Sequence, residues 1–165
     1  MAENFSFDVV SDFDRQELVN ALDQVRREIS QRYDLKGSDT LLELEKENII
    51  ITTNSELTLN SINDIICQKA IKRKLSLKIF EFGELDSVSG NKVKQIISLK
   101  QGLKQEVAKK ISKDIRDQFK KINVSINGEN LRVSSKSKND LQLVIQLLIE
   151  LEETYNIPLK ANNFR

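Results

Sequence analysis

The sequence predicts an α+β fold of two ferredoxin-like domains, each a four-stranded antiparallel sheet with two helices over one face. The chain has 165 residues, which is enough for two small domains. Strand and helix periodicities alternate in the order strand, helix, strand, strand, helix, strand, and that order occurs twice. The halves also correspond locally, because ITTNS at 51–55 and VSSKS at 133–137 hold the same place in each.

The first half opens with a strand at 5–10, where apolar and polar residues alternate. Asp14 and Glu17 have the spacing of a capping box, which starts a helix that Gly37 ends. Ser55 is the expected N-cap of a second helix, whose basic last turn suits the helix dipole. The other strands of this half are expected at 42–45, 49–53 and 77–82.

The second half follows a stretch at 84–92 that is rich in Asp, Ser, Gly and Asn, and we expect this stretch to be a linker. Asn127-Gly128 is a strong hairpin signal between two strands. Ser137 and Asp140 form another capping-box pair. We expect strands at 93–99, 123–126, 131–135 and 158–161, helices at 103–119 and 138–153, and domains at 1–88 and 89–165.

The composition excludes several kinds of site. The chain has no histidine and one cysteine, Cys67, so a Ser-His-Asp triad, a Cys-His pair and a typical zinc site cannot form. We therefore expect a protein that is not an enzyme and holds no metal or cofactor. No apolar run approaches the roughly 20 residues of a membrane-spanning helix, and no signal peptide is visible. The single cysteine suits a reducing compartment, so we expect a cytoplasmic protein without membrane contact.

The net charge of +1 hides an uneven distribution. Residues 1–66 carry a net charge of −8, residues 67–121 a net charge of +9, and residues 122–165 none. Such asymmetry predicts a basic surface for phosphates in the middle of the chain. Pairing between the acidic and basic portions explains the pattern equally well.

The best phosphate candidate is the junction between strand 93–99 and the helix that follows. Unpaired backbone N–H groups and the helix dipole attract anions at such a junction, and Gly102 permits close approach. A plain tight turn explains Gly102 equally well, and the spacing of a P-loop is missing. The candidate ligand-binding residues, here and near the second hairpin, are Lys100, Gln101, Gly102, Lys104, Arg132, Lys136 and Lys138.

Helix 103–119 offers a second kind of contact. Lys109, Lys110, Lys113 and Arg116 form a basic face that suits a nucleic-acid backbone, although exposed lysines need no such role. RNA-recognition modules stack bases on aromatic residues of their central strands, and strands 49–53 and 131–135 contain none. Phe80 and Phe82 share a face with Lys78, and we expect them to pack in the core rather than against a base.

The chain resembles the YajQ family of bacterial nucleotide-binding proteins along essentially its whole length. The resemblance is carried by SFDVVS at 6–11, KQGL at 100–103, KKI at 109–111, the run 127–142 and the closing NFR at 163–165. It implies two domains of RNA-recognition-like topology whose first strands, 5–10 and 93–99, are exchanged between the sheets. It also implies GTP, cyclic di-GMP or RNA as candidate ligands, but no specific ligand residues.

Four functions remain open at this point. We expect a non-catalytic nucleotide-binding protein that senses a guanine nucleotide or cyclic dinucleotide and acts through a regulatory protein partner. The first alternative is an RNA-binding module that uses the basic helix face. The second is a small hydrolase that uses carboxylates such as Asp8, Asp12 and Asp14, and the third is a protein-interaction adaptor that uses the open sheet faces.

Overall fold

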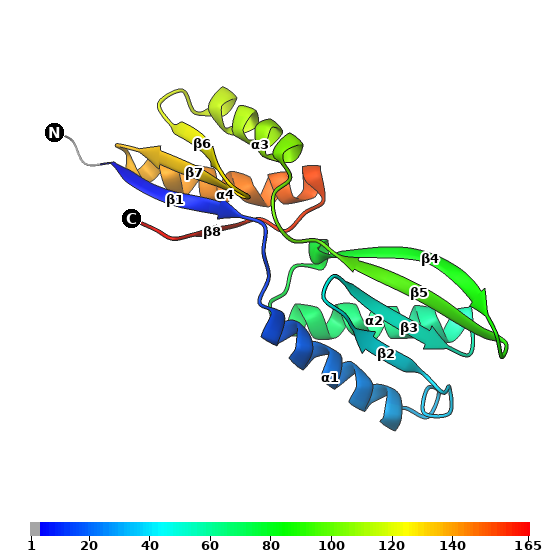
Figure 1. The fold of residues 1–165 in the computed structure, drawn as a ribbon. Coiled ribbons are helices and arrows are strands. Elements are labelled where there is room, and N and C mark those ends of the chain that lie inside the picture. Colours follow the sequence, from blue (N-terminus) through cyan, green and yellow to red (C-terminus); the bar gives the residue numbers. More distant parts are fainter. Residues whose placement is uncertain (1–3) are drawn as a thin grey trace. The chain divides into compact units, whose positions relative to one another are not determined.

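The computed structural model describes residues 4–165 and contains four α-helices, one short 3-10 helix and eight strands there. Figure 1 shows their arrangement. In chain order they are β1 (Phe5–Val10), α1 (Arg15–Gln31), β2 (Leu41–Leu44), β3 (Asn48–Thr53), α2 (Glu56–Lys72), η1 (Leu77–Ile79), β4 (Phe80–Val88), β5 (Lys92–Leu99), α3 (Gln105–Gln118), β6 (Asn123–Asn127), β7 (Asn130–Ser135), α4 (Lys138–Tyr155) and β8 (Lys160–Asn162).

These elements form two compact units. Unit 1 combines the N-terminal segment up to Asp12 with Gln101–Arg165, and unit 2 is Phe13–Lys100. The sheet of unit 1 has the strand order β6-β7-β1-β8, and that of unit 2 has the order β2-β3-β5-β4. In each unit two helices cover one face of an antiparallel sheet (Figure 1). The predicted fold class is confirmed.

Each sheet takes its first strand from the other half of the sequence. β1 lies between β7 and β8, with Phe7 opposite Val133 and Asp8 opposite Asn162. β5 lies between β3 and β4, with Ile97 opposite Ile49. This pairing is the strand exchange that the resemblance implies. The expected domain bounds, 1–88 and 89–165, meet in the turn between β4 and β5, and which segments fold on their own stays a prediction.

The core of each unit lies between its sheet and its helices. In unit 2 the inward residues of β3 and β5 pack against the apolar stripes of α1 and α2, as the spacing of the sequence predicts. In unit 1 Phe7 and Val9 of β1 and alternate residues of β7 pack against α3 and α4. The fully enclosed residues include Leu18, Ile49, Ile51, Leu59, Ile62 and Ile97 in unit 2, and Phe7, Val9, Ile111, Leu131 and Val133 in unit 1.

The expected linker at 84–92 is wrong. Residues up to Val88 continue β4, and Lys92 already begins β5. The turn-forming composition is overridden because β4 pairs with β5 on both sides of a bulge between Phe82 and Leu85. Only the short tip around Gly90 and Asn91, which both have positive φ, is a turn. The strand expected from Leu77 starts at Phe80 instead, because Ser76 caps a 3-10 turn ahead of it.

Candidate functional site

The turn before α3 is held by backbone hydrogen bonds. The N–H of Gly102 donates to the Ser11 carbonyl oxygen at 2.6 Å, and the N–H of Leu103 donates to the Glu129 carbonyl oxygen at 3.2 Å. Gly102 has φ +85, and a Cβ there would lie 3.0–3.2 Å from the Glu129 carboxylate atoms. An anion can reach these two N–H groups only by displacing their carbonyl partners, and left-handed geometry by itself explains the glycine.

The neighbouring candidates are also partly engaged. In unit 2 the N–H of Lys100 donates to the Ile79 carbonyl oxygen at 2.8 Å. In unit 1 the Gln101 amide donates to the Asp12 carboxylate at 2.6 Å. Lys104 is exposed and is the N-cap of α3, but its side chain caps no N–H group of the first turn. The role of Lys100, Gln101, Gly102 and Lys104 in ligand binding stays a prediction.

A cleft of about 310 Å³ opens at the start of α4, and we call it the α4 cleft. Ser137 caps the helix by accepting a hydrogen bond from the Asp140 N–H at 3.2 Å, and the Ser135 hydroxyl accepts one from the Ser137 N–H at 3.0 Å. Lys121 and Lys136 are exposed at the cleft, and they bring two cations against the one carboxylate of Asp140. Its lining residues are Asn4, Lys121, Asn123, Ser135, Lys136, Ser137 and Asp140.

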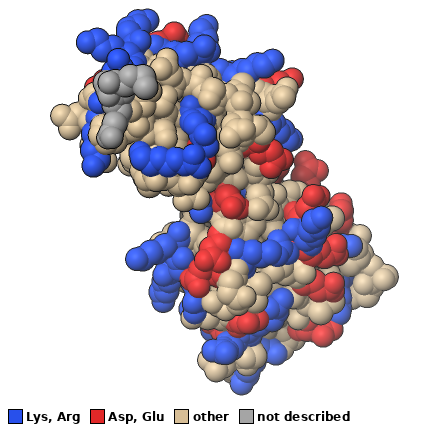
Figure 2. Space-filling view, turned by 60° about the vertical axis from the view of Figure 1, so that its left-hand side comes forward, with Lys and Arg blue, Asp and Glu red and all other residues tan. Residues whose placement is uncertain are grey.

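The basic face expected on α3 is present and exposed. Lys109, Lys113 and Arg116 follow one another at one-turn spacing, and Lys110 is exposed beside them. Figure 2 shows Lys and Arg side chains gathered over part of unit 1, whereas both signs of charge mix on unit 2. One acidic residue of α3, Asp114, accepts a hydrogen bond from the Tyr155 hydroxyl, so its charge is directed toward α4. Whether the basic face contacts nucleic acid stays a prediction.

Arg132 lies on the sheet of unit 1, away from the α4 cleft. Its Nε donates to the Asp8 carboxylate at 3.2 Å, and the Asn163 amide donates to the other Asp8 oxygen at 3.0 Å. The Asn163 hydrogen bond and then Arg132 hold the pKa of Asp8 below its usual value, although burial opposes the shift. The sequence suggests Asp8 only as a hydrolase carboxylate, and it gives no signal that Asn163 would reach this carboxylate.

Lys138 is the first residue of α4, and its Nζ lies 5.5 Å from the centre of the Phe5 ring. The structure therefore brings Lys136 and Lys138 together at the start of α4. It separates them from Arg132, which belongs to the Asp8 cluster on the opposite face of the sheet from Phe7.

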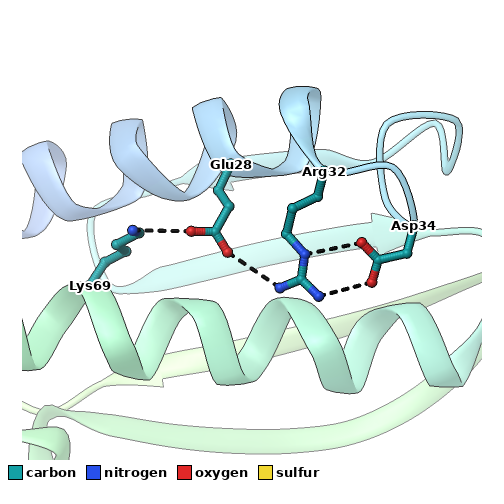
Figure 3. Close-up of polar contacts among 4 residues, drawn as sticks. All are labelled: Glu28, Arg32, Asp34 and Lys69. Atoms are coloured by element: carbon teal, nitrogen blue, oxygen red, sulfur yellow. Dashed lines mark hydrogen bonds and ion pairs between the residues drawn. The ribbon is translucent and has the colours of Figure 1, made fainter.

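Several cations of unit 2 form ion pairs. Glu28 accepts from Lys69 at 3.1 Å and from Arg32 at 3.3 Å, and Arg32 also forms two contacts with Asp34 (Figure 3). Lys69 and then Arg32 lower the pKa of Glu28. This network links α1 to α2, so a structural role explains these cations.

Unit 2 also holds a cleft of about 360 Å³ between the end of α1 and the start of β2. Arg26, which lines it, donates to the Leu42 carbonyl oxygen and pairs with Asp23. Asp39, at φ +52, pairs with Lys92 at 2.6 Å. The cleft therefore offers an anion few uncommitted donors.

Two other features of the sequence, the Phe80–Phe82 pair and Cys67, lie in or near the core of unit 2. Phe80 is buried in the core of unit 2, as expected, but Phe82 at the edge strand is 41% exposed, and Lys78 lies in η1 rather than on their strand. Cys67 is half-buried, and burial followed by Asp64 raises the pKa of its thiol.

Residues 4–165 contain no group of three His, Cys, Asp or Glu side chains placed to hold a metal ion. Over the same range, the helices lack the combination of length and apolar character that crossing a membrane requires.

Proteins described as nucleotide-binding have similar sequences. Residues 5–165 match the family model described as nucleotide-binding protein YajQ-like. A nucleotide-binding protein of Prochlorococcus marinus strain MIT 9312 is 81% identical over 165 residues, and the match covers 100% of both chains. The corresponding protein of strain MIT 9211 is 59% identical with the same full coverage. The family resemblance seen in the sequence is confirmed.

Proposed function

Because the chain belongs to the YajQ-like family of nucleotide-binding proteins, we propose that it binds a nucleotide phosphate in the α4 cleft. The proposed ligand is a guanine nucleotide or a cyclic dinucleotide, and the proposed partners are regulatory proteins. The proposal includes no catalysis and a cytoplasmic location, and the absence of histidine and the single cysteine support both.

The observation that carries the proposal is the composition of the α4 cleft. Lys121 and Lys136 converge on the first turn of an 18-residue helix, where the backbone N–H groups of Lys138 and Asn139 point outward from the helix end. The helix dipole and two ammonium groups favour a phosphate there, and the hydroxyl of Ser137 adds a polar group. Asp140 opposes them with one negative charge.

The internal repeat indicates that the helix cap does not require Lys136 or Lys138. Residues 51–55 of unit 2 correspond to residues 133–137 of unit 1, and Ser55 caps α2 as Ser137 caps α4. In unit 2 the residues on either side of the capping serine are Asn54 and Glu56, whereas in unit 1 they are Lys136 and Lys138. The same cap therefore forms with or without basic neighbours.

Calorimetric titration with GTP, ATP, cyclic di-GMP and a short single-stranded RNA, each at low and moderate salt, tests the proposal. We expect saturable binding of one nucleotide, and a Kd raised roughly 10- to 150-fold by Lys136→Ala or Lys121→Ala, because hydrogen bonds to charged groups contribute about 1.5–3 kcal/mol. Lys160→Ala is the matched control, since Lys160 pairs with Val10 at the other end of β1 from Asn4. Equal affinity of all three variants and the wild type would contradict the assignment of the phosphate to the α4 cleft.

The second candidate function is RNA binding through α3. The observation that favours it is the exposed basic face of α3, formed by Lys109, Lys110, Lys113 and Arg116. Four phosphate contacts predict a slope of about −3 in a plot of log affinity against log salt concentration, because each contact to a single strand contributes about −0.7. Binding of RNA alone, with that slope and no effect of Lys136→Ala, would favour this function over the first.

A further inference from the structure

A second cavity in unit 1, of about 280 Å³, adjoins the α4 cleft, and we call it the tail pocket. Its walls come from the start of β1, the first two turns of α4 and the C-terminal segment, which runs alongside β1 (Figure 1). The aromatic, basic and amide residues that line it are Phe5, Phe7, Phe164, Lys138, Gln142 and Arg165.

A bulge positions the C-terminal segment. Asn162 lies opposite Asp8, and Arg165 exchanges two backbone hydrogen bonds with Ser6 at 2.9 and 3.2 Å. Between these two pairings the C-terminal segment advances by three residues, whereas β1 advances by only two. Asn163, at φ +56, is the extra residue and forms the bulge. Its amide is fixed by the hydrogen bond to Asp8. The bulge brings Phe164 to Phe7, with ring centres 5.8 Å apart and ring planes inclined by 37°.

The pocket combines aromatic surfaces with cations. Phe7 is fully buried at its floor, and Phe5 is half-buried with the Lys138 ammonium over its ring. Phe164 is 63% exposed, so most of its ring is open to a ligand although it touches Phe7. A flat, polar-edged ring system that carries negative charge elsewhere fits this combination, because such rings stack on aromatic side chains while cations hold the charge.

The size and position of the tail pocket further restrict the kind of group that it can bind. Its volume of about 280 Å³ lies just below the range of roughly 300–1,000 Å³ for ligand pockets, which suits one ring system better than a whole ligand. It shares a rim with the α4 cleft, because Asn4, Ser137 and Asp140 line the cleft while their chain neighbours Phe5, Lys138 and Leu141 line the pocket.

We propose that the tail pocket binds the base of the nucleotide whose phosphate lies in the α4 cleft, by stacking it against Phe164 and Phe5. This inference rests on the proposed function and adds the site that recognises the base. Gln142 offers both a donor and an acceptor to the edge of the base, and Lys138 lies between base and phosphate.

The repeat provides an independent argument. Phe5 lies opposite Ser135 as Val93 lies opposite Thr53, so Phe7 corresponds to Gln95. β4 has a bulge at the position that Asn163 occupies, and by that register Phe164 corresponds to Leu85. The aromatic residues of unit 1 are thus replaced in unit 2 without loss of the fold. If Phe164 served only as a cover for the core, an aliphatic residue would be sufficient there, as it is in unit 2.

The test uses the absence of tryptophan from the chain. Phe164→Trp places the only tryptophan on the open wall of the pocket while it keeps an aromatic ring. We expect saturable quenching of its fluorescence by the nucleotide that binds in calorimetry, at the same Kd, and no quenching by ribose 5-phosphate at equal concentration. Tyr33→Trp is the matched control, because Tyr33 is 90% exposed in unit 2.

Two further variants separate stacking from core cover. We expect Phe164→Ala and Phe164→Leu both to weaken nucleotide binding roughly 5- to 150-fold, because stacking of a base on an aromatic side chain is lost in each. Phe164→Leu retains the apolar cover, so its unfolding midpoint in urea should stay close to that of the wild type.

The possible outcomes are distinct. Quenching that matches calorimetry, together with weakened binding by Phe164→Leu, supports the base site. Nucleotide binding in calorimetry without quenching, and with unchanged Kd in both variants, overturns the base site while the proposed function stands. Absence of any nucleotide binding by the wild type overturns the proposed function, and the base site with it.

Discussion

Gly102 offers a test of whether the turn before α3 is shaped by the fold or by a ligand. Its φ of +85 lies in the region that L-residues avoid, and forcing a residue with a Cβ into that region costs roughly 1–2 kcal/mol. The added Cβ would also meet the Glu129 carboxylate at 3.0–3.2 Å. Glu129 is exposed and the carboxylate is the end of a flexible side chain, so this contact is relieved by a small movement. We therefore expect Gly102→Ala to lower the free energy of unfolding of unit 1 by about 1–2 kcal/mol, nearly all from the backbone.

Two other glycines make this expectation specific. Gly128 has φ +63, and a Cβ added there would have no atom within 4 Å, so Gly128→Ala should show the backbone cost alone and match Gly102→Ala to within about 0.5 kcal/mol. Gly37 has neither a positive φ nor a close neighbour, so Gly37→Ala should be neutral or stabilise unit 2 by roughly 0.4–1 kcal/mol. Glu129→Ala should rescue little of the loss in a Gly102→Ala background.

Urea unfolding followed by near-ultraviolet circular dichroism measures these changes. Tyr155 reports on unit 1 because it packs against the core of that unit and its hydroxyl donates to Asp114 of α3, whereas Tyr33 is 90% exposed and contributes little signal. A Gly102→Ala protein with wild-type stability, alongside a destabilised Gly128→Ala, would refute the reasoning. If that stable variant also lost nucleotide binding, the ligand role predicted for Gly102 would be supported instead.

Three further outcomes follow from the packing and the titrating groups. The pKa of Asp8 is lower in the folded protein than in the unfolded chain. The contribution of Asp8 to stability is therefore present above the unfolded pKa of about 3.9 and is lost as the pH falls through the lower folded value. The unfolding free energies of wild type and Asp8→Asn, measured between pH 2 and 7, should converge at the acid end. Burial and then Asp114 raise the pKa of Tyr155 to about 12. The stabilising effect of Tyr155 is therefore present below about pH 10 and is lost toward pH 12. Absorbance at 295 nm should show one tyrosine that ionises near pH 12, and Tyr155→Phe should remove that phase. Ile111→Ala should destabilise unit 1 by about 2–5 kcal/mol because Ile111 is fully buried in its core; a loss below 1 kcal/mol in urea unfolding would contradict that packing.

Local sequence patterns are sufficient to predict most of the secondary structure. The helix starts follow directly from the sequence, because Asp14, Ser55 and Ser137 each accept a backbone hydrogen bond as N-caps. The β4–β5 hairpin is missed because its turn-forming residues outnumber its apolar ones, and only pairing across the sheet keeps residues 84–88 extended. The exchange of β1 and β5 is not accessible from periodicity, since each strand is compatible with either sheet. It is implied only by the family resemblance.

The candidate site is predicted less well than the fold, for a physical reason. A sequence shows that Lys136 precedes a capped helix, but not that Lys121 arrives at the same cleft from the end of α3. Similarly, the closing residues 163–165 match the family pattern without any indication that a bulge at Asn163 would bring Phe164 to Phe7. Long-range convergence depends on register and on backbone conformation, and neither is expressed in local composition.

The two units differ in how the charges on their helices are paired. In unit 2, Arg26 of α1 pairs with Asp23, and Arg32 at the end of the helix pairs with Glu28 and Asp34. On α3 of unit 1 the acid nearest the core, Asp114, is occupied by the Tyr155 hydroxyl. The helix carries four cations against three acids, since Glu106 and Asp117 are exposed beside the lysines. Lys121, beyond the end of α3, lines the α4 cleft. If the α4 cleft binds a phosphate as proposed, Lys121 and Lys136 would attract it over about 8–10 Å at physiological salt.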